Sequence, residues 1–164
     1  MRLTSFSDYS LRVLMYLALD RNRLATIPEI AAAYGISQNH LMKVVHQLAR
    51  GGVIESVRGK GGGLRLAHAP QAIRVGAIVR AAEGNAPIVE CLSGKPGGCR
   101  IAPVCKLTRV LKGAFDALYE YLDGYTLADL MVNRKAIASI LVTLPTERAG
   151  ARPASRRAPA ARQA

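Results

Sequence analysis

The sequence predicts a mainly α-helical protein: a winged helix-turn-helix followed by one long amphipathic helix. Three observations support this fold class. Two short helical segments flank a turn at Gly35, two strand-like segments follow a stop at Gly51, and apolar residues recur at three- and four-residue steps over positions 107–122. With 164 residues, half of them apolar, the chain is long enough for one packed domain and a tail.

The first helix is expected over residues 4–20, because apolar residues recur there at spacings of three and four. A capping box at residues 26–29, with proline in its first turn, begins a short second helix that runs through Ala33. Gly35 then supplies the positive φ that a tight break requires. The apolar residues that define the first helix are Phe6, Tyr9, Val13, Leu14 and Leu17.

A third helix and a β-hairpin follow. Ser37 caps the third helix, which is expected to reach Arg50 and to turn four apolar side chains inward. Residues 53–57 and 64–67 are predicted as two short strands, joined by the basic, glycine-rich loop 58–63. A short helix over residues 73–82 comes next. The inward side chains of the third helix are Leu41, Val44, Val45 and Leu48.

The periodic segment near the C-terminus predicts a helix of four to five turns whose apolar stripe needs a partner. Charged residues occupy its other face. Thr126 and Asn133 are predicted to cap two further short helices. The stripe consists of Leu107, Val110, Leu111, Ala114, Phe115, Leu118 and Leu122.

The charge balance points to a polyanionic partner. The net charge is +12 and the pI is about 10.3, which favours nucleic acid or an acidic membrane surface. No apolar run approaches the roughly 18 residues that span a bilayer, and residues 2–20 lack a signal-peptide layout. We therefore expect a cytosolic protein with no membrane role. Residues 146–164 carry five Arg and one Glu among Ala and Pro, and are predicted to be a disordered basic tail.

The second helix of a helix-turn-helix fits the DNA major groove. Gln38 and Asn39 can each bond adenine through two hydrogen bonds, and Lys43 can reach guanine or phosphate. Each residue alone could equally belong to a solvated polar face, but the combination favours binding to double-stranded DNA. The other candidates are His40 on the same helix, Arg58 and Lys60 on the wing loop, and Arg12 and Arg50 as phosphate partners.

The only three cysteines, Cys91, Cys99 and Cys105, lie in a Gly/Pro-rich loop with the spacing C-x7-C-x5-C. Soft thiolates this close together suit an iron–sulfur cluster or zinc. Structural zinc usually has tighter C-x2–4-C pairs and four protein ligands, which disfavours zinc. Three thiolates leave one coordination position for another type of ligand.

Two readings without metal stay open. A disulfide with one spare thiol is unusual in the cytosol. Three buried core thiols would suit a better-packed segment than this loop, which contains Gly94, Pro96 and Pro103. Cys105 begins the long helix, whose dipole favours a thiolate there.

Three segments carry a family resemblance. They are the N-terminal Met1-Arg-Leu-Thr-Ser-Phe-Ser-Asp8-Tyr-Ser-Leu-Arg-Val-Leu14, the wing Ile54-Glu-Ser-Val-Arg-Gly-Lys-Gly-Gly-Gly-Leu-Arg-Leu66, and Cys99-Arg-Ile-Ala-Pro-Val-Cys105-Lys-Leu107. They resemble the winged-helix iron–sulfur regulators that include NsrR and IscR. The last segment is most similar to the NsrR branch, the nitric-oxide-sensing repressors. The resemblance covers about residues 1–142 and does not extend to the tail.

The resemblance implies a homodimer with crossed long helices, each cluster being held by the three cysteines of one subunit. A [4Fe–4S] cluster is favoured over [2Fe–2S]. In some members a carboxylate on the partner's first helix is the fourth ligand, and Asp8 stands at the matching place; a first-turn acid that stabilises the helix N-terminus is the alternative. IscR-like members place a His three residues after the last Cys, where this chain has Thr108.

Together these features predict a transcriptional repressor that binds an inverted-repeat operator and leaves it when nitric oxide damages its cluster. Alternatives are a cluster-dependent regulator of iron–sulfur assembly or iron supply, and a metal-free thiol redox switch. An enzyme is disfavoured, since no paired carboxylates, Ser/His/Asp set or nucleotide loop is evident. The expected organisation is residues 1–82 for DNA binding, 83–105 for the cluster loop, 106–145 for dimerisation and C-terminal helices, and 146–164 for the tail.

Overall fold

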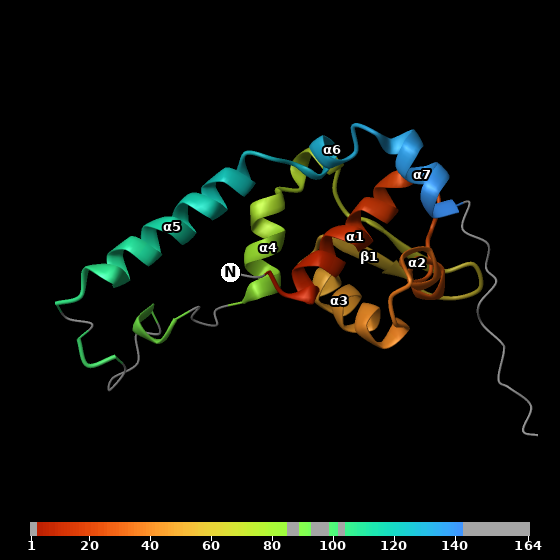
Figure 1. Cartoon of the computed structure of the whole chain (residues 1–164). Helices are drawn as coiled ribbons and strands as arrows, with labels where there is room; N and C mark the ends of the chain where they lie inside the picture. Colours follow the sequence, from red (N-terminus) through yellow and green to blue (C-terminus); the bar gives the residue numbers. More distant parts are fainter. Residues whose placement is uncertain (1–2, 85–88, 93–98, 102–103, 143–164) are drawn as a thin grey trace, which may run out of the picture.

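The computed structural model describes residues 3–84, 89–92, 99–101 and 104–142 (Figure 1). Three helices and a two-stranded antiparallel sheet form the N-terminal body, with the α4 helix packed against α1. This arrangement confirms the predicted winged helix-turn-helix. The elements of the body are α1 (Ser5–Leu19), α2 (Ile27–Tyr34), α3 (Gln38–Arg50), β1 (Ile54–Val57), β2 (Gly63–Leu66), a 3-10 turn η1 (Pro70–Ala72) and α4 (Val75–Glu83).

The C-terminal elements extend from this body and then return to it. The α5 helix projects away from the winged domain, and the chain comes back so that α6 and α7 lie over α1 and α2 (Figure 1). Across the described residues, each helix is too short or too polar to cross a bilayer. The elements are a 3-10 turn η2 (Glu90–Leu92), α5 (Lys106–Asp123), α6 (Leu127–Leu130) and α7 (Arg134–Val142).

Capping residues set the helix boundaries much as the sequence predicts. The Thr4 side chain accepts a hydrogen bond from the Ser7 amide, and Thr26 forms both bonds of a capping box. Gly35 ends α2 with φ 65, a left-handed conformation that favours glycine, and Ser37 caps α3. Each such N-cap stabilises its helix by about 1 kcal/mol.

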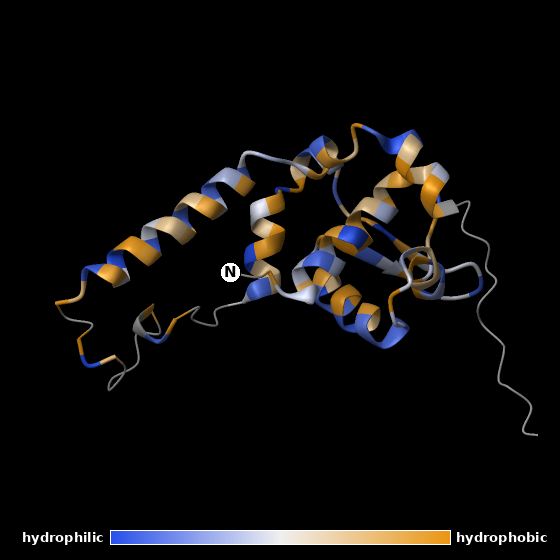
Figure 2. Cartoon of the chain, in the orientation of Figure 1, coloured by the Kyte–Doolittle hydropathy of each residue, from blue (hydrophilic) through white to orange (hydrophobic). Residues whose placement is uncertain are grey.

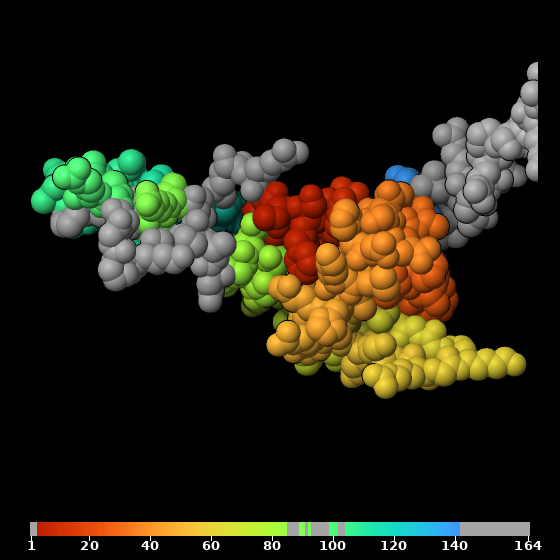
Figure 3. Space-filling model, turned by 90° about the horizontal axis from the view of Figure 1, so that it is seen from below, coloured from red at the N-terminus to blue at the C-terminus, as the bar shows by residue number. Residues whose placement is uncertain are grey.

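The wing is attached to the body by backbone pairing. Ile54 pairs with Leu66 and Ser56 with Leu64, while Ala25, in the α1–α2 connection, exchanges hydrogen bonds with Leu64 at 2.8 and 3.1 Å. Because Ile54 of β1 and Leu64 and Leu66 of β2 are buried, the sheet packs firmly on the helices. The loop at its tip stands out as a narrow arm (Figure 3, yellow).

The hydrophobic core lies between α1, α2, α3 and the sheet, and α4 and α6 close it. Leu127 of α6 is buried there, and its amide donates to the Ile73 carbonyl at 2.8 Å. This bond, with a bridge between Arg74 and Thr126, holds residues 73–74 extended, so α4 begins at Val75 rather than at the predicted position 73. The largest fully buried side chains are Leu14, Ile30, Leu41, Leu127, Val13, Val44 and Val79.

The α5 helix meets α4 near its own C-terminal end. Arg80 donates to both oxygens of Asp123, at 2.7 and 2.5 Å, and its guanidinium lies 5.2 Å from the centroid of the Tyr119 ring. A Cβ on Gly76 would lie 2.9 Å from the Asp123 amide nitrogen, so glycine permits this close approach. Apolar residues recur along α5 (Figure 2, orange), and none of them is fully buried.

Other boundaries differ from the sequence predictions by a residue or two. Thr4 and Asp20 are caps outside α1, and Glu83 belongs to α4 rather than to the cysteine loop. Thr126 forms the predicted cap of α6, and α7 begins just after Asn133. The basic tail predicted over residues 146–164 lies outside the described residues.

Candidate nucleic-acid interface and cysteine loop

The α3 helix presents one polar face to solvent. It buries Leu41, Val44, Val45 and Leu48 against the core and exposes the four predicted base-reading candidates. Its thirteen residues include no acid, so the whole exposed face is neutral or basic. The exposed candidates are Gln38, Asn39, His40 and Lys43, and the same face continues through Met42, His46, Gln47 and Arg50.

The wing supplies two further cations on the same side of the molecule. Arg58 and Lys60 are exposed in the loop between β1 and β2. Figure 3 views the molecule from below and shows α3 and the wing together on this face. A helix for the major groove and a basic loop for the flanking backbone therefore face one direction, as DNA binding requires.

Arg12 has a different environment from the other DNA-contact candidates. Its Nε donates to Asp8 at 2.9 Å, and its guanidinium lies 5.7 Å from the centroid of the Tyr34 ring. The hydrogen bond to Asp8 raises the pKa of Arg12, and burial raises the pKa of Tyr34 to about 12. Arg12 thus links α1 to the end of α2, and its role as a phosphate partner stays a prediction. His40 remains exposed, with its ring 6.3 Å from that of Tyr9.

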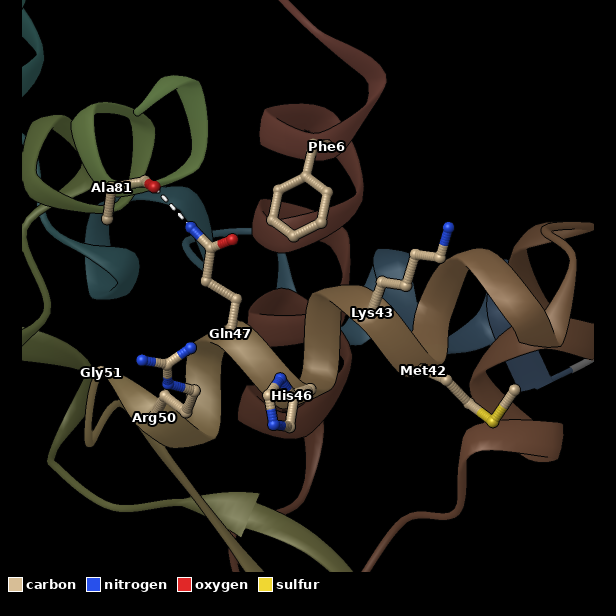
Figure 4. Close-up of a pocket in the computed structure, with 8 residues that line it drawn as sticks. All are labelled: Phe6, Met42, Lys43, His46, Gln47, Arg50, Gly51 and Ala81. Atoms are coloured by element: carbon tan, nitrogen blue, oxygen red, sulfur yellow. Dashed lines mark hydrogen bonds between the residues drawn. The ribbon is translucent and has the colours of Figure 1, made fainter. Parts of the chain in front are cut away.

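A groove of about 680 Å³ runs along the exposed face of α3, between the start of α1 and the end of α4 (Figure 4). The Gln47 side-chain amide crosses it and donates to the Ala81 carbonyl. This bond connects α3 to the last turn of α4. The lining residues are Phe6, Met42, Lys43, His46, Gln47, Arg50, Gly51 and Ala81.

The same turn of α4 also holds the start of α1. The Glu83 carboxylate accepts hydrogen bonds from the Thr4 amide at 2.9 Å, from the Thr4 hydroxyl at 3.0 Å and from the Ser7 hydroxyl. Partial burial raises the pKa of Glu83, but the bonds from Ser7 and Thr4 outweigh this effect and lower the pKa overall. An acid at a helix C-terminus is unfavourable, because that end of the helix dipole is negative. Here the positive N-terminal end of the α1 dipole offsets this cost for Glu83. Sequence reasoning missed this contact, because no local pattern pairs two positions that are 79 residues apart.

The cysteines lie at the far end of α5 from the winged domain. Cys99 and Cys105 are free and half-buried, and Cys105 is the N-cap residue of α5 without a side-chain capping bond. Cys91 is in η2, and its side chain is outside the described part of the structure. The first turn of α1, to which the half-exposed Asp8 belongs, is well separated from the first turn of α5 (Figure 1). In one copy, the described residues bring together no group of three or more metal-ligating side chains.

Comparison with known proteins identifies relatives of the whole DNA-binding and helical region. The model of the Rrf2 family, described as an iron-dependent transcriptional regulator, matches residues 3–133. The HTH-type transcriptional regulator NsrR of Bacillus subtilis is 46% identical over 142 residues, covering 86% of this chain and 97% of the relative. The regulator of the same name from Bacillus licheniformis is 44% identical and covers 86% and 99%.

Solved structures agree with this relationship. T. potens IscR is similar with a TM-score of 0.65 and 25% identity, over 81% of this chain and 88% of that one. Staphylococcus aureus CymR is similar with a TM-score of 0.62 and 26% identity, over 79% and 97%. The chain therefore belongs to the Rrf2 family and is a DNA-binding transcriptional regulator rather than an enzyme.

Proposed function

We propose that this regulator is a homodimeric repressor that senses nitric oxide through an iron–sulfur cluster, with [4Fe–4S] favoured over [2Fe–2S]. Cys91, Cys99 and Cys105 of one subunit would hold the cluster, and Asp8 of the partner subunit would complete the set. The observation that carries this proposal is the donor set: three cysteines in one short loop of a chain that is 46% identical to a regulator named NsrR. When bound, the cluster supplies iron that reacts with nitric oxide.

The described residues around the loop fit such a group. Both described thiols are free, and Cys105 lies at the N-terminus of α5, where the helix dipole favours a thiolate. One turn later, the Thr108 hydroxyl is a buried atom without a hydrogen-bond partner among the described residues. A thiolate or sulfide nearby would give that hydroxyl an acceptor. Soft thiolate ligands suit iron–sulfur clusters.

A second copy is needed to bring Asp8 to the cysteines. In one copy the first turn of α1, to which Asp8 belongs, and the start of α5, which Cys105 caps, lie on opposite sides of α4 (Figure 1). The apolar stripe of α5 is largely unburied, with Leu107 55% and Val110 64% exposed. Pairing α5 with a second α5 would bury this stripe and carry the loop of one subunit toward the α1 helix of the other.

Residues of α4 connect the loop to the reading helix. The loop follows Gly84, directly after the turn in which Glu83 holds α1 and the Ala81 carbonyl holds Gln47 of α3. Loss of the cluster would release the cysteines and Asp8. This release would weaken both contacts of the turn, the one between Glu83 and α1 and the one between Ala81 and Gln47. The spacing of the two α3 helices in the dimer would then no longer match the operator.

Anaerobic purification tests the proposal. We expect a brown protein that absorbs near 400 nm and contains iron and sulfide, and whose operator affinity falls when nitric oxide is added. Cys91→Ala, Cys99→Ala and Cys105→Ala should each lose iron and sulfide yet remain folded dimers, because α5 supplies its own apolar stripe. A colourless protein whose DNA binding responds to thiol oxidants would contradict the proposal and support a thiol switch. Normal iron and sulfide in one variant would remove that cysteine from the ligand set.

A further inference from the structure

The exposed face of α3 extends further than the four base-reading candidates. At 3.6 residues per turn, Asn39, Lys43, His46 and Arg50 follow one another along the side opposite the buried residues. His46 is exposed in the middle of this row. It also lines the groove of Figure 4, and no hydrogen bond or ion pair holds its side chain among the described residues.

The surroundings of His46 make its charge matter for DNA. Lys43 precedes it by three residues and Arg50 follows it by four, so both are neighbours on the helix surface. The groove residues contributed by the other elements, Phe6 from α1 and Ala81 from α4, carry no charge, and neither does Gln47. A DNA phosphate beside this row would face two cations, Lys43 and Arg50, with His46 between them.

We propose that His46 is a DNA-contacting residue whose imidazolium binds a backbone phosphate, so that DNA affinity rises as pH falls. Histidine changes charge between pH 5 and 8, unlike the lysine and arginine beside it. Since bound phosphate favours the charged form, DNA binding takes up a proton at this site. At low pH His46 adds one phosphate contact per subunit, and at high pH the neutral ring adds none. This regulation depends on DNA binding alone and is separate from the cysteine loop.

The test measures the affinity of the full-length, anaerobically purified protein for a mixed-sequence duplex of about 30 base pairs, at pH 6 and pH 8 and several salt concentrations. Such a duplex serves because phosphate contacts are independent of sequence. We expect wild-type affinity to be about three- to tenfold higher at pH 6, and the salt slope to steepen by about 0.9 for each added phosphate contact. His46→Gln should bind at both pH values with the affinity that the wild type has at pH 8. His46→Arg should bind at both pH values with the affinity that the wild type has at pH 6.

His68→Gln is the matched control, because His68 is exposed and lies in the segment after β2, outside α3 and outside the row of α3 side chains. It should retain the wild-type pH dependence. Iron content is measured for every sample, so that a change in the cysteine loop is recognised separately. The inference is overturned if His46→Gln keeps the wild-type difference between pH 6 and pH 8, or if His40→Gln alone abolishes it.

Discussion

Gln38 and Asn39 occupy the first turn of α3, the part of a recognition helix that enters a major groove most deeply. Their side chains are exposed and reach solvent from a helix end fixed by the Ser37 cap. Lys60 differs, because it lies on a glycine-rich loop and carries a charge that any phosphate attracts. These residues should therefore affect specificity and affinity in different ways.

Gln38→Ala or Asn39→Ala should lose roughly 1–3 kcal/mol of discrimination between the operator and random DNA, because each amide can form two hydrogen bonds with adenine. Lys60→Ala should weaken binding to both DNAs alike and flatten the salt dependence. Competition binding at several salt concentrations measures both effects. An equal loss on both DNAs for Gln38→Ala would exclude it as a base reader.

Asp8 gives a second prediction at the scale of one residue. An oxygen ligand binds iron less tightly than thiolate, so Asp8→Ala should still assemble a cluster, with a changed spectrum and lability. Asp8→Cys should make the cluster more inert. The rate of cluster loss to nitric oxide or a chelator in the three proteins decides between ligand and structural acid. Identical rates would leave Asp8 as the partner of Arg12 only.

At the scale of elements, local signals predict the helices well and their contacts poorly. The capping box at Thr26, the break at Gly35 and the cap at Ser37 each act within one turn, so the sequence shows them directly. The hydrogen bonds from Thr4 to Glu83 join positions 79 residues apart. No local pattern encodes such a pairing, and the same holds for the contact between Arg12 and Tyr34.

Glu83 should stabilise the attachment of α1 to α4 in a pH-dependent way. Its pKa is lower in the folded protein than in the unfolded chain, so its contribution is present above the unfolded value and is lost as pH falls through the folded one. Glu83→Gln should lower the free energy of unfolding by about 1–3 kcal/mol at pH 7. The difference from wild type should shrink below about pH 4.

Urea unfolding followed by circular dichroism measures this difference. Glu55→Gln is the control, because Glu55 pairs with Arg65 on the exposed wing, where an ion pair contributes about 0–1 kcal/mol. Equal losses for the two variants at pH 7 would show that Glu83 is only a surface acid.

At the scale of the whole molecule, the sequence predicts the long helix but not where it points. The stripe from Leu107 to Leu122 specifies an amphipathic helix, yet an apolar stripe does not identify the surface that covers it. The direction of α5 is set by the contacts of Arg80 with Asp123 and Tyr119, which are long-range. The cysteine spacing likewise indicates the chemistry of the loop without showing its distance from Asp8.

Leu111→Asp should convert the proposed dimer to a monomer while the winged domain stays folded, because Leu111 lies on the stripe and outside the core. Arg109→Asp introduces an aspartate on the opposite, polar face of α5 and should leave the dimer intact. Sedimentation equilibrium gives the oligomeric state, and circular dichroism confirms folding. A monomeric wild type, or dimers of both variants, would contradict the role of α5.

The joint between α4 and α5 also gives the molecule a mechanical property. With 18 residues, α5 is about 27 Å long, and its contacts with α4 lie near one end. It can therefore rotate as a rigid body about the Gly76–Asp123 contact, and Cys105 lies at the end that moves most. Given the rise per residue of a helix, a rotation of about 5° about this contact moves the N-terminal end of α5 by about 2 Å. A force applied at the cysteine end of α5 therefore exerts a torque on α4 that is proportional to the length of the helix.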